Sequence, residues 1–179
     1  MLEPAIYNIY FKKDFLMNNK ILEISSEVGN LLKEKNQTLG IVESSAGGML
    51  SASILAIPGS SAFYLGGVVV YTKRSISGLM KITSADMLGI RSSTEECALL
   101  YARKIKNHLK CDWALSETGA AGPTGNSYGD RAGHTCIAVN GCTVSSKTIE
   151  TNQSDRKENM YLFVENSLSF LYESLQACK

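Results

Sequence analysis

Between residues 21 and 117, helical patterns alternate with short apolar runs, and this alternation limits the folds open to the chain. Residues 21–35 place apolar side chains at helical spacing, and 38–44 (TLGIVES) form a run typical of a buried strand. A second helical pattern over 45–57 and a second run rich in β-branched residues over 66–72 follow. Such alternation is typical of parallel strands that are covered by helices.

The second half of the chain predicts a β-hairpin as well as helices. Asn140-Gly141 is a dipeptide that favours a two-residue hairpin turn, here between strands at 134–139 and 142–149. Ser93 and Glu96 have the spacing of a capping box, which opens a helix that runs to about Leu109. The remaining elements expected are a short helix over 75–80, a strand over 112–117 and a last helix from about residue 154.

These patterns predict one α/β domain, built as a three-layer α/β/α sandwich whose mixed sheet is mostly parallel. The domain covers residues 18–179, and residues 1–17 are expected to be an N-terminal extension, which the sequence gives no reason to order. The 179 residues suffice to bury a core without metals or disulfides.

The charge balance limits the classes of partner. Eighteen basic and seventeen acidic residues give a net charge of +1, which argues against a nucleic acid held mainly by bulk charge. No apolar run approaches the roughly 20 residues that a membrane-spanning helix needs. A small anionic ligand held by a few local groups remains compatible with this composition.

Five cysteines without CxxC spacing suit free thiols in a reducing, cytoplasmic setting. The candidate set of zinc ligands is His134, Cys136 and Cys142. A two-residue turn would place Cys142 opposite Val139, on the other face of the hairpin from His134 and Cys136. In that register the three side chains cannot converge, so we expect no metal site.

Glycine-rich segments at the ends of the expected strands could form a ligand pocket. They are Ser44 to Gly48, Pro58 to Ser61 and Gly119 to Gly133. Glycine lets a ligand approach the backbone, and a helix that begins at Gly47 or Gly48 would offer N–H groups to a phosphate or carboxylate. Neither GxxxxGK[ST] nor GxGxxG occurs, and the glycines could equally serve tight turns and close packing.

A serine in these segments would need a base to become a nucleophile. The chain has only His108 and His134, and no GxSxG elbow, so a Ser-His-Asp triad has little support. His108 falls among lysines near a helix end, where solvation explains it. A serine activated by a lysine or a tyrosine is the alternative.

Three segments together resemble the CinA C-terminal domain family: VESSAGGMLSASILAIPGSSAFYLGGVVVYTKRS, ALSETGAAGPTGNSYGDRAGHTCIAV and a later SDR. The specific elements are GSS, the tyrosine ten residues later, and TGxAGP. The resemblance runs from residue 18 to the end. It implies deamidation of nicotinamide mononucleotide to nicotinic acid mononucleotide and ammonia, by a serine hydrolase mechanism without a metal or other cofactor.

The resemblance also implies a set of site residues. The family's nucleophile is matched to Ser61 of the GSS motif, with Tyr71 and Thr118 as further catalytic candidates. Arg156 is expected to hold phosphate or assist the oxyanion. The expected substrate-binding residues also include Ser44, Gly47, Gly48, Ser60 and Gly119.

One departure from the family pattern affects catalysis directly. The lysine that usually lies five residues after the tyrosine is Ile76 here, and isoleucine moves no proton. Lys73 could replace it if the strand stays extended, because Tyr71 and Lys73 would then share a face. His134, which replaces the threonine of the family's GTV segment, is a second possible base with a pKa suited to neutral pH.

Two functions follow from these residues. Retained Ser61, Tyr71, Thr118 and Arg156 favour an amidohydrolase, and Ile76 favours a catalytically silent module that binds a ligand or a partner. The resemblance further implies a stand-alone domain and a homo-oligomer. Its expected ligand is a pyridine nucleotide, and neither a nucleic acid nor a membrane is expected as a partner.

Overall fold

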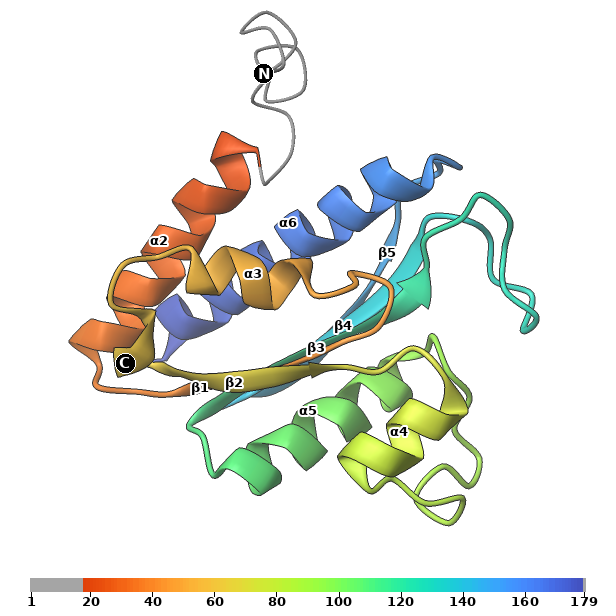
Figure 1. The fold of residues 1–179 in the computed structure, drawn as a ribbon, viewed down its shortest axis with the longest axis horizontal. Helices are drawn as coiled ribbons and strands as arrows, with labels where there is room; N and C mark the ends of the chain where they lie inside the picture. Colours follow the sequence, from red (N-terminus) through yellow and green to blue (C-terminus); the bar gives the residue numbers. More distant parts are fainter. Residues whose placement is uncertain (1–17, 179) are drawn as a thin grey trace, which may run out of the picture.

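A five-stranded sheet runs through the centre of the computed structural model, which describes residues 18–178 (Figure 1). The strands lie in the order β2-β1-β3-β4-β5. Their bounds are Leu39–Glu43 (β1), Tyr64–Val69 (β2), Trp113–Ala120 (β3), His134–Asn140 (β4) and Val144–Glu150 (β5). β1 pairs in parallel with β2 and β3, whereas β4 is antiparallel to both β3 and β5. Only β4 runs against the others, which confirms a mixed, mostly parallel sheet.

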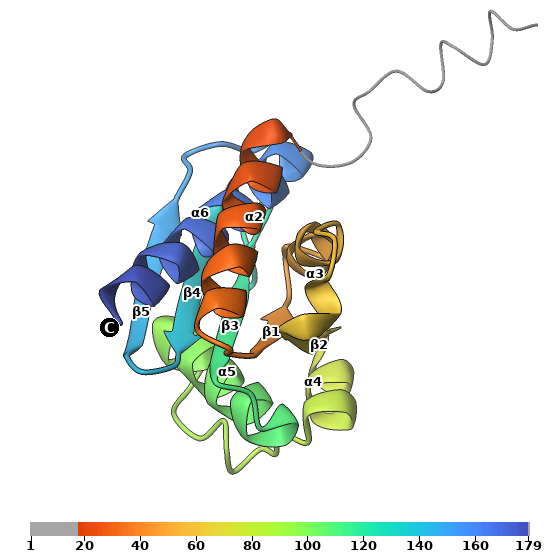
Figure 2. The same ribbon diagram turned by 90° about the vertical axis from the view of Figure 1, so that its left-hand side faces the viewer.

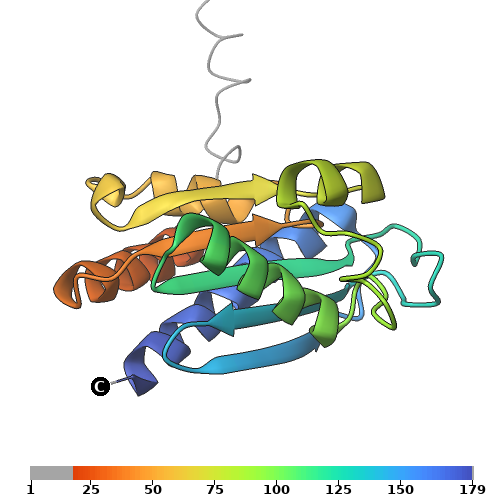
Figure 3. The same cartoon turned by 90° about the horizontal axis from the view of Figure 1, so that it is seen from below.

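Helices cover both faces of the sheet, so the three-layer architecture is confirmed (Figures 2 and 3). One face carries α2 (Asn19–Glu34), α3 (Met49–Leu55) and α6 (Arg156–Ala177), and the other carries α4 (Lys73–Met80) and α5 (Glu95–Leu109). Alternate residues of β3 point to opposite faces. Trp113 and Leu115 therefore pack in the core under α2 and α6, and Ala114 packs in the core under α5.

Two helix starts differ from the sequence prediction. α4 begins at Lys73 rather than at residue 75, because Thr72 caps it by accepting a hydrogen bond from the Ser75 N–H. α5 is capped by Thr94, whose side chain accepts from the Cys97 N–H, and not by Ser93. Ser93 has a φ of 58°, outside the extended range that an N-cap residue usually adopts.

The hairpin turn between β4 and β5 has three residues, so the expected two-residue Asn-Gly turn is wrong. Asn140 pairs with Val144, and the Gly141 N–H donates to the Thr143 carbonyl at 2.8 Å. A Cβ on Gly141 would lie 2.2 Å from the Trp113 ring, so packing on the indole requires glycine here. Cys142 thus lies in the turn, and the strand register predicted for it is also wrong.

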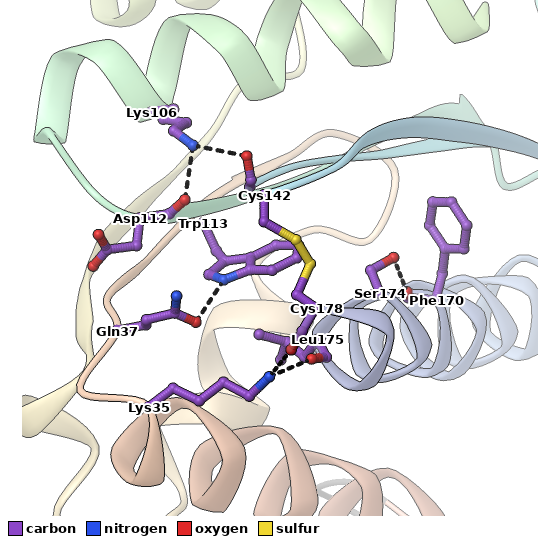
Figure 4. The surroundings of a disulfide bond; sticks show 11 residues. Lys35, Gln37, Lys106, Asp112, Trp113, Cys142, Phe170, Ser174, Leu175 and Cys178 are labelled. Carbon is purple, nitrogen blue, oxygen red and sulfur yellow. Dashed lines mark hydrogen bonds between the residues drawn. A yellow bond between two sulfur atoms is a disulfide. The ribbon is translucent and has the colours of Figure 1, made fainter.

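Cys142 forms a disulfide with Cys178, which corrects the prediction of five free thiols (Figure 4). The remaining cysteines, Cys97, Cys111 and Cys136, are free and buried. The disulfide joins the hairpin turn to the end of α6, beside the indole of Trp113.

The β2 edge of the sheet is open. Leu65 and Val69 on this strand are 46% and 41% exposed, and no residue from Gly59 to Thr72 carries a charge. No helix among the described residues has the length and hydropathy to cross a membrane. The expected extension, residues 1–17, lies outside the described residues.

Candidate functional site

The carboxyl ends of β1 and β3, together with the segment after β2, enclose a cavity of about 240 Å³ that we call the serine cavity. Ligands collect at this edge in open α/β sheets. This edge of the sheet lies near the projecting loop 121–133 and α4 in Figure 1. Five expected site residues line it: Ser44, Tyr71, Lys73, Thr118 and Gly119. The prediction that these residues come together is supported by this shared lining.

A second cavity of about 210 Å³, the arginine cavity, shares Tyr71 and Gly119 with the serine cavity. Arg156, the first residue of α6, reaches it: Nη1 donates to the Gly122 carbonyl at 2.7 Å and Nη2 donates to the Tyr71 hydroxyl at 3.2 Å. No acidic side chain among residues 18–178 pairs with this guanidinium. Its positive charge is therefore available to an anionic group of a ligand.

Glu117, fully buried near the end of β3, holds the loop that carries Ser44. Its carboxylate accepts from the Ser44 N–H at 3.1 Å and from the Ala46 N–H at 2.8 Å. The hydroxyls of Ser45 and Thr135 donate to the other oxygen. These bonds fix the backbone on both sides of Ser44.

A second buried carboxylate is that of Glu43, the last residue of β1, and it bonds to backbone N–H groups at the start of α3. It accepts from the Gly48 N–H at 2.9 Å, the Leu50 N–H at 2.9 Å and the Ser51 N–H at 2.8 Å. Burial raises the pKa of Glu43, although the hydrogen bonds from Ser51 and Leu50 act against that shift. The expectation that Gly48 offers a free N–H to an anionic ligand is therefore wrong.

Sequence reasoning missed the role of both glutamates, although a signal was present. Each is the one acidic residue of a largely buried strand, lies near its carboxyl end, and is followed by a serine or a threonine. A carboxylate is tolerated there when backbone N–H groups surround it.

Ser60 and Ser61 do not share the site with Ser44. They lie in the short 3₁₀ helix Ser60–Ala62, which precedes β2, whereas Tyr71 follows the other end of that strand. A six-residue strand spans about 20 Å, so the chain holds these two serines at the opposite end of the sheet from Tyr71. Neither lines the serine cavity or the arginine cavity. This separation removes the basis for Ser61 as the nucleophile of a site that contains Tyr71 and Thr118 within one chain.

Lys73 and Ile76 both line the serine cavity, one turn apart on α4. The strand-face argument for Lys73 was wrong, because β2 ends at Val69 and Lys73 is already helical. Lys73 nevertheless reaches the cavity that contains Tyr71. The other candidate base, His134, does not line it.

His134 is engaged elsewhere, between β5 and the start of α5. Its Nδ1 bonds to the Glu150 carboxylate at 2.5 Å and its Nε2 lies 3.0 Å from the Ser93 carbonyl. Burial alone would lower the pKa of His134, but the bonds to Glu150 and Ser93 outweigh it and the pKa is raised. With both ring nitrogens occupied, His134 is not the substitute base.

The model of the family described as "CinA C-terminal domain" matches residues 21–175. The chain belongs to the CinA C-terminal domain family. A CinA-like protein of Sulfurihydrogenibium sp. is 35% identical over 113 residues, which cover 63% of this chain and 28% of that protein. A CinA-like protein of Nostoc sp. is 34% identical over 140 residues, covering 78% and 32%. The chain thus spans less than a third of the length of either relative.

A solved structure gives the same fold. It is described as the competence damage-inducible protein A (ComA) from Klebsiella pneumoniae subsp. pneumoniae, with a TM-score of 0.83 at 27% identity, and the match covers 90% of this chain and all of that one. The region matched by the CinA model contains every residue that lines the serine and arginine cavities, while Cys178 lies beyond it.

Proposed function

We propose that this CinA domain is an amidohydrolase that removes ammonia from the carboxamide of a pyridine mononucleotide, with Ser44 as the nucleophile in place of Ser61. The observation that carries the proposal is the serine cavity, in which Ser44 lies with Tyr71, Lys73 and Thr118. The family resemblance supplies the substrate class, nicotinamide mononucleotide.

Each cavity has a task in this reaction. The serine cavity receives the carboxamide, where Thr118 and the backbone of Gly119 orient it. The arginine cavity receives the phosphate, which accepts hydrogen bonds from Arg156. Tyr71 lines both cavities and accepts a hydrogen bond from Arg156, so it aligns the phosphate end with the reacting end.

The bonds and protons balance as follows. Ser44 Oγ attacks the carboxamide carbon, and its hydroxyl proton passes through the Tyr71 hydroxyl, which lines the same cavity, to the amide nitrogen. The C–N bond then breaks and ammonia leaves, so Ser44 carries the acyl group as an ester. Water attacks that ester, and its proton passes through the same tyrosine hydroxyl to Ser44 Oγ, which releases the carboxylic acid. The Ser45 N–H, which has no acceptor among residues 18–178, is the proposed oxyanion donor.

The test is ammonia release from nicotinamide mononucleotide by the wild-type protein and two serine variants. Ser44→Ala should lose at least about a thousandfold in kcat, since removal of a nucleophile disables the whole catalytic unit. Ser61→Ala is the matched control and should stay within about twofold. Full activity in Ser44→Ala, or loss confined to Ser61→Ala, would refute the assignment.

The second candidate function is a binding module without catalysis, and Ile76 favours it. Its side chain lines the serine cavity at the family's lysine position, and isoleucine provides no proton acceptor. Ile76→Lys separates the two functions. A silent wild type that gains ammonia release in this variant supports the binding module, whereas an active wild type that loses activity in Tyr71→Phe supports the hydrolase.

A cytoplasmic location and a homo-oligomer remain proposals. The Cys142–Cys178 disulfide makes the first measurable. A location in a reducing compartment predicts that thiol labelling in freshly lysed cells modifies both cysteines, whereas labelling only after reduction would contradict that location and agree with the disulfide. Sedimentation of the purified protein tests the second.

A further inference from the structure

A cavity of about 510 Å³ lined by α4 and the segment after it, which we call the α4 cavity, adjoins the serine cavity. It is enclosed by α4, the segment 82–92 and Tyr128. Lys73, Ile76, Ser92 and Tyr128 line both it and the serine cavity, so the two are adjacent compartments of one site. Ligand-binding cavities measure about 300–1,000 Å³. The serine cavity alone is below this range, and the α4 cavity falls within it.

The lining of the α4 cavity defines the kind of group that it can take. Its apolar side chains are Ile76, Ile82, Met87 and Ile90, and no acidic residue lines it. Apolar surfaces such as these favour a ring or short chain over a strongly hydrated group.

The charges around the α4 cavity leave one cation for a ligand. Arg91 is neutralised by Asp130, with N–O distances of 2.5 and 2.8 Å. Lys73 forms no ion pair with any residue from 18 to 178. Because Lys73 lines both cavities, its charge lies at their junction.

We propose that the α4 cavity is a second binding subsite of the serine site, which takes an apolar ring or short chain of the ligand while one anionic group of the same ligand pairs with Lys73 at the junction. The inference rests on the proposed function only in placing the reacting carboxamide beside Ser44. It adds a substrate class: amides whose remaining part includes an apolar group larger than the serine cavity admits.

The test uses 1-anilinonaphthalene-8-sulfonate, which joins aromatic rings to one anionic group and fluoresces when its rings leave water. Ser84→Trp should raise its Kd about tenfold, which corresponds to ~1.4 kcal/mol, because Ser84 lines the α4 cavity only and its surface position accepts a larger side chain. Leu88→Trp is the matched control, since Leu88 is 86% exposed and lies outside the lining. Its Kd should equal that of the wild type.

Two further variants keep the test decisive. Ser77→Trp fills the same cavity from α4 and replaces Ser84→Trp if that variant does not fold. Lys73→Met should weaken probe binding about fivefold, through loss of the paired charge. Equal Kd values in the wild type, Ser84→Trp and Ser77→Trp would overturn the proposal, as would equal weakening in Leu88→Trp.

Probe binding and catalysis can fail separately. If Ser84→Trp weakens binding of the probe but the wild type releases no ammonia, the subsite proposal is retained and the hydrolase proposal is refuted. If the wild type releases ammonia but its probe Kd equals that of Ser84→Trp and of Ser77→Trp, the hydrolase proposal is retained and the subsite proposal is refuted.

Discussion

The two ends of the sheet use the same kinds of residue for opposite purposes. At the amino end of β1 and β3, polar groups close the fold: Asp112 accepts from the Thr38 N–H and hydroxyl, and Lys106 donates to the carbonyls of Asp112 and Gly141. At the carboxyl end, Ser44, Tyr71, Lys73 and Thr118 line cavities.

The difference shows how a site is kept open. At the carboxyl end, the carboxylates of Glu43 and Glu117 accept the hydrogen bonds that order the backbone of residues 44–50. The side chains that line the serine cavity are therefore not needed to hold that backbone. At the amino end the lysines themselves bond to backbone carbonyls, as Lys35 does with Leu175 (Figure 4). Ser61 lies at that end of the sheet, is exposed, and lines neither the serine cavity nor the arginine cavity.

The sharpest way to break this comparison is to neutralise one carboxylate at each end. Glu117→Gln should cost about 4 kcal/mol of unfolding free energy, because each buried donor without an acceptor costs about 1–3 kcal/mol. It should also lower kcat/KM for ammonia release about a hundredfold by displacing Ser44. Asp112→Asn, at the exposed amino end, should change stability by less than about 1 kcal/mol. Chemical denaturation and the ammonia assay measure both; equal effects would end the distinction.

Reduction of the disulfide tests the amino end alone. Cys142 and Cys178 are 36 residues apart, and closing a loop of this length contributes about 3–4 kcal/mol in the chain-entropy description. Cys142→Ser should lose about that much, and dithiothreitol should lower the Tm of the wild type but not of the variant. A wild-type Tm insensitive to the reductant would show that this link adds nothing.

Gly119 and Gly78 differ in the space that each leaves for a Cβ atom. A Cβ on Gly119 would lie 2.4 Å from the His134 carbonyl oxygen, whereas one on Gly78 would meet nothing within 4 Å. We expect Gly119→Ala to cost about 2–3 kcal/mol by overpacking. Gly78→Ala, within α4, should stabilise by about 0.5–1 kcal/mol through helix propensity. Thermal unfolding of the pair decides; a destabilised Gly78→Ala would contradict the open space at α4.

The smallest effect concerns pH. The pKa of His134 is raised in the folded protein, so its contribution to stability is complete below about pH 6.5, the unfolded value, and is lost as pH rises through the folded pKa. Tm should therefore decline from pH 6 to pH 8 in the wild type. His134→Gln should flatten that decline while leaving ammonia release intact, because His134 does not line the serine cavity. An unchanged pH profile would assign the decline to other groups.

The layers of the fold could be predicted because their patterns are local. Residues 21–35 and the strand at 38–44 were each identified within two residues of α2 and β1. The turn at Gly141 could not be predicted, because contact with Trp113, distant in sequence, determines it. The disulfide could not be predicted for the same reason, because Cys142 and Cys178 come together only when α6 packs on the sheet.

The residues that line the serine cavity could be predicted, but the position of Ser61 away from them could not. Ser44 and Tyr71 follow strands and Thr118 lies near the carboxyl end of β3, and the shared edge of a parallel sheet brings such positions together. Ser61 precedes its strand, and a motif match carries no information on which end of a strand it occupies. Strand direction alone would have separated Ser44 from Ser61.

The length of α6 relates the disulfide to the arginine cavity. The helix has 22 residues, Arg156 to Ala177, and a helix of this length extends about 33 Å. Cys178, the residue that follows the helix, forms the disulfide with Cys142. Arg156, the first residue of the helix, donates a hydrogen bond to Tyr71. One helix therefore connects the disulfide at the amino end of the sheet with the guanidinium at the carboxyl end, and its buried residues pack on the sheet between them.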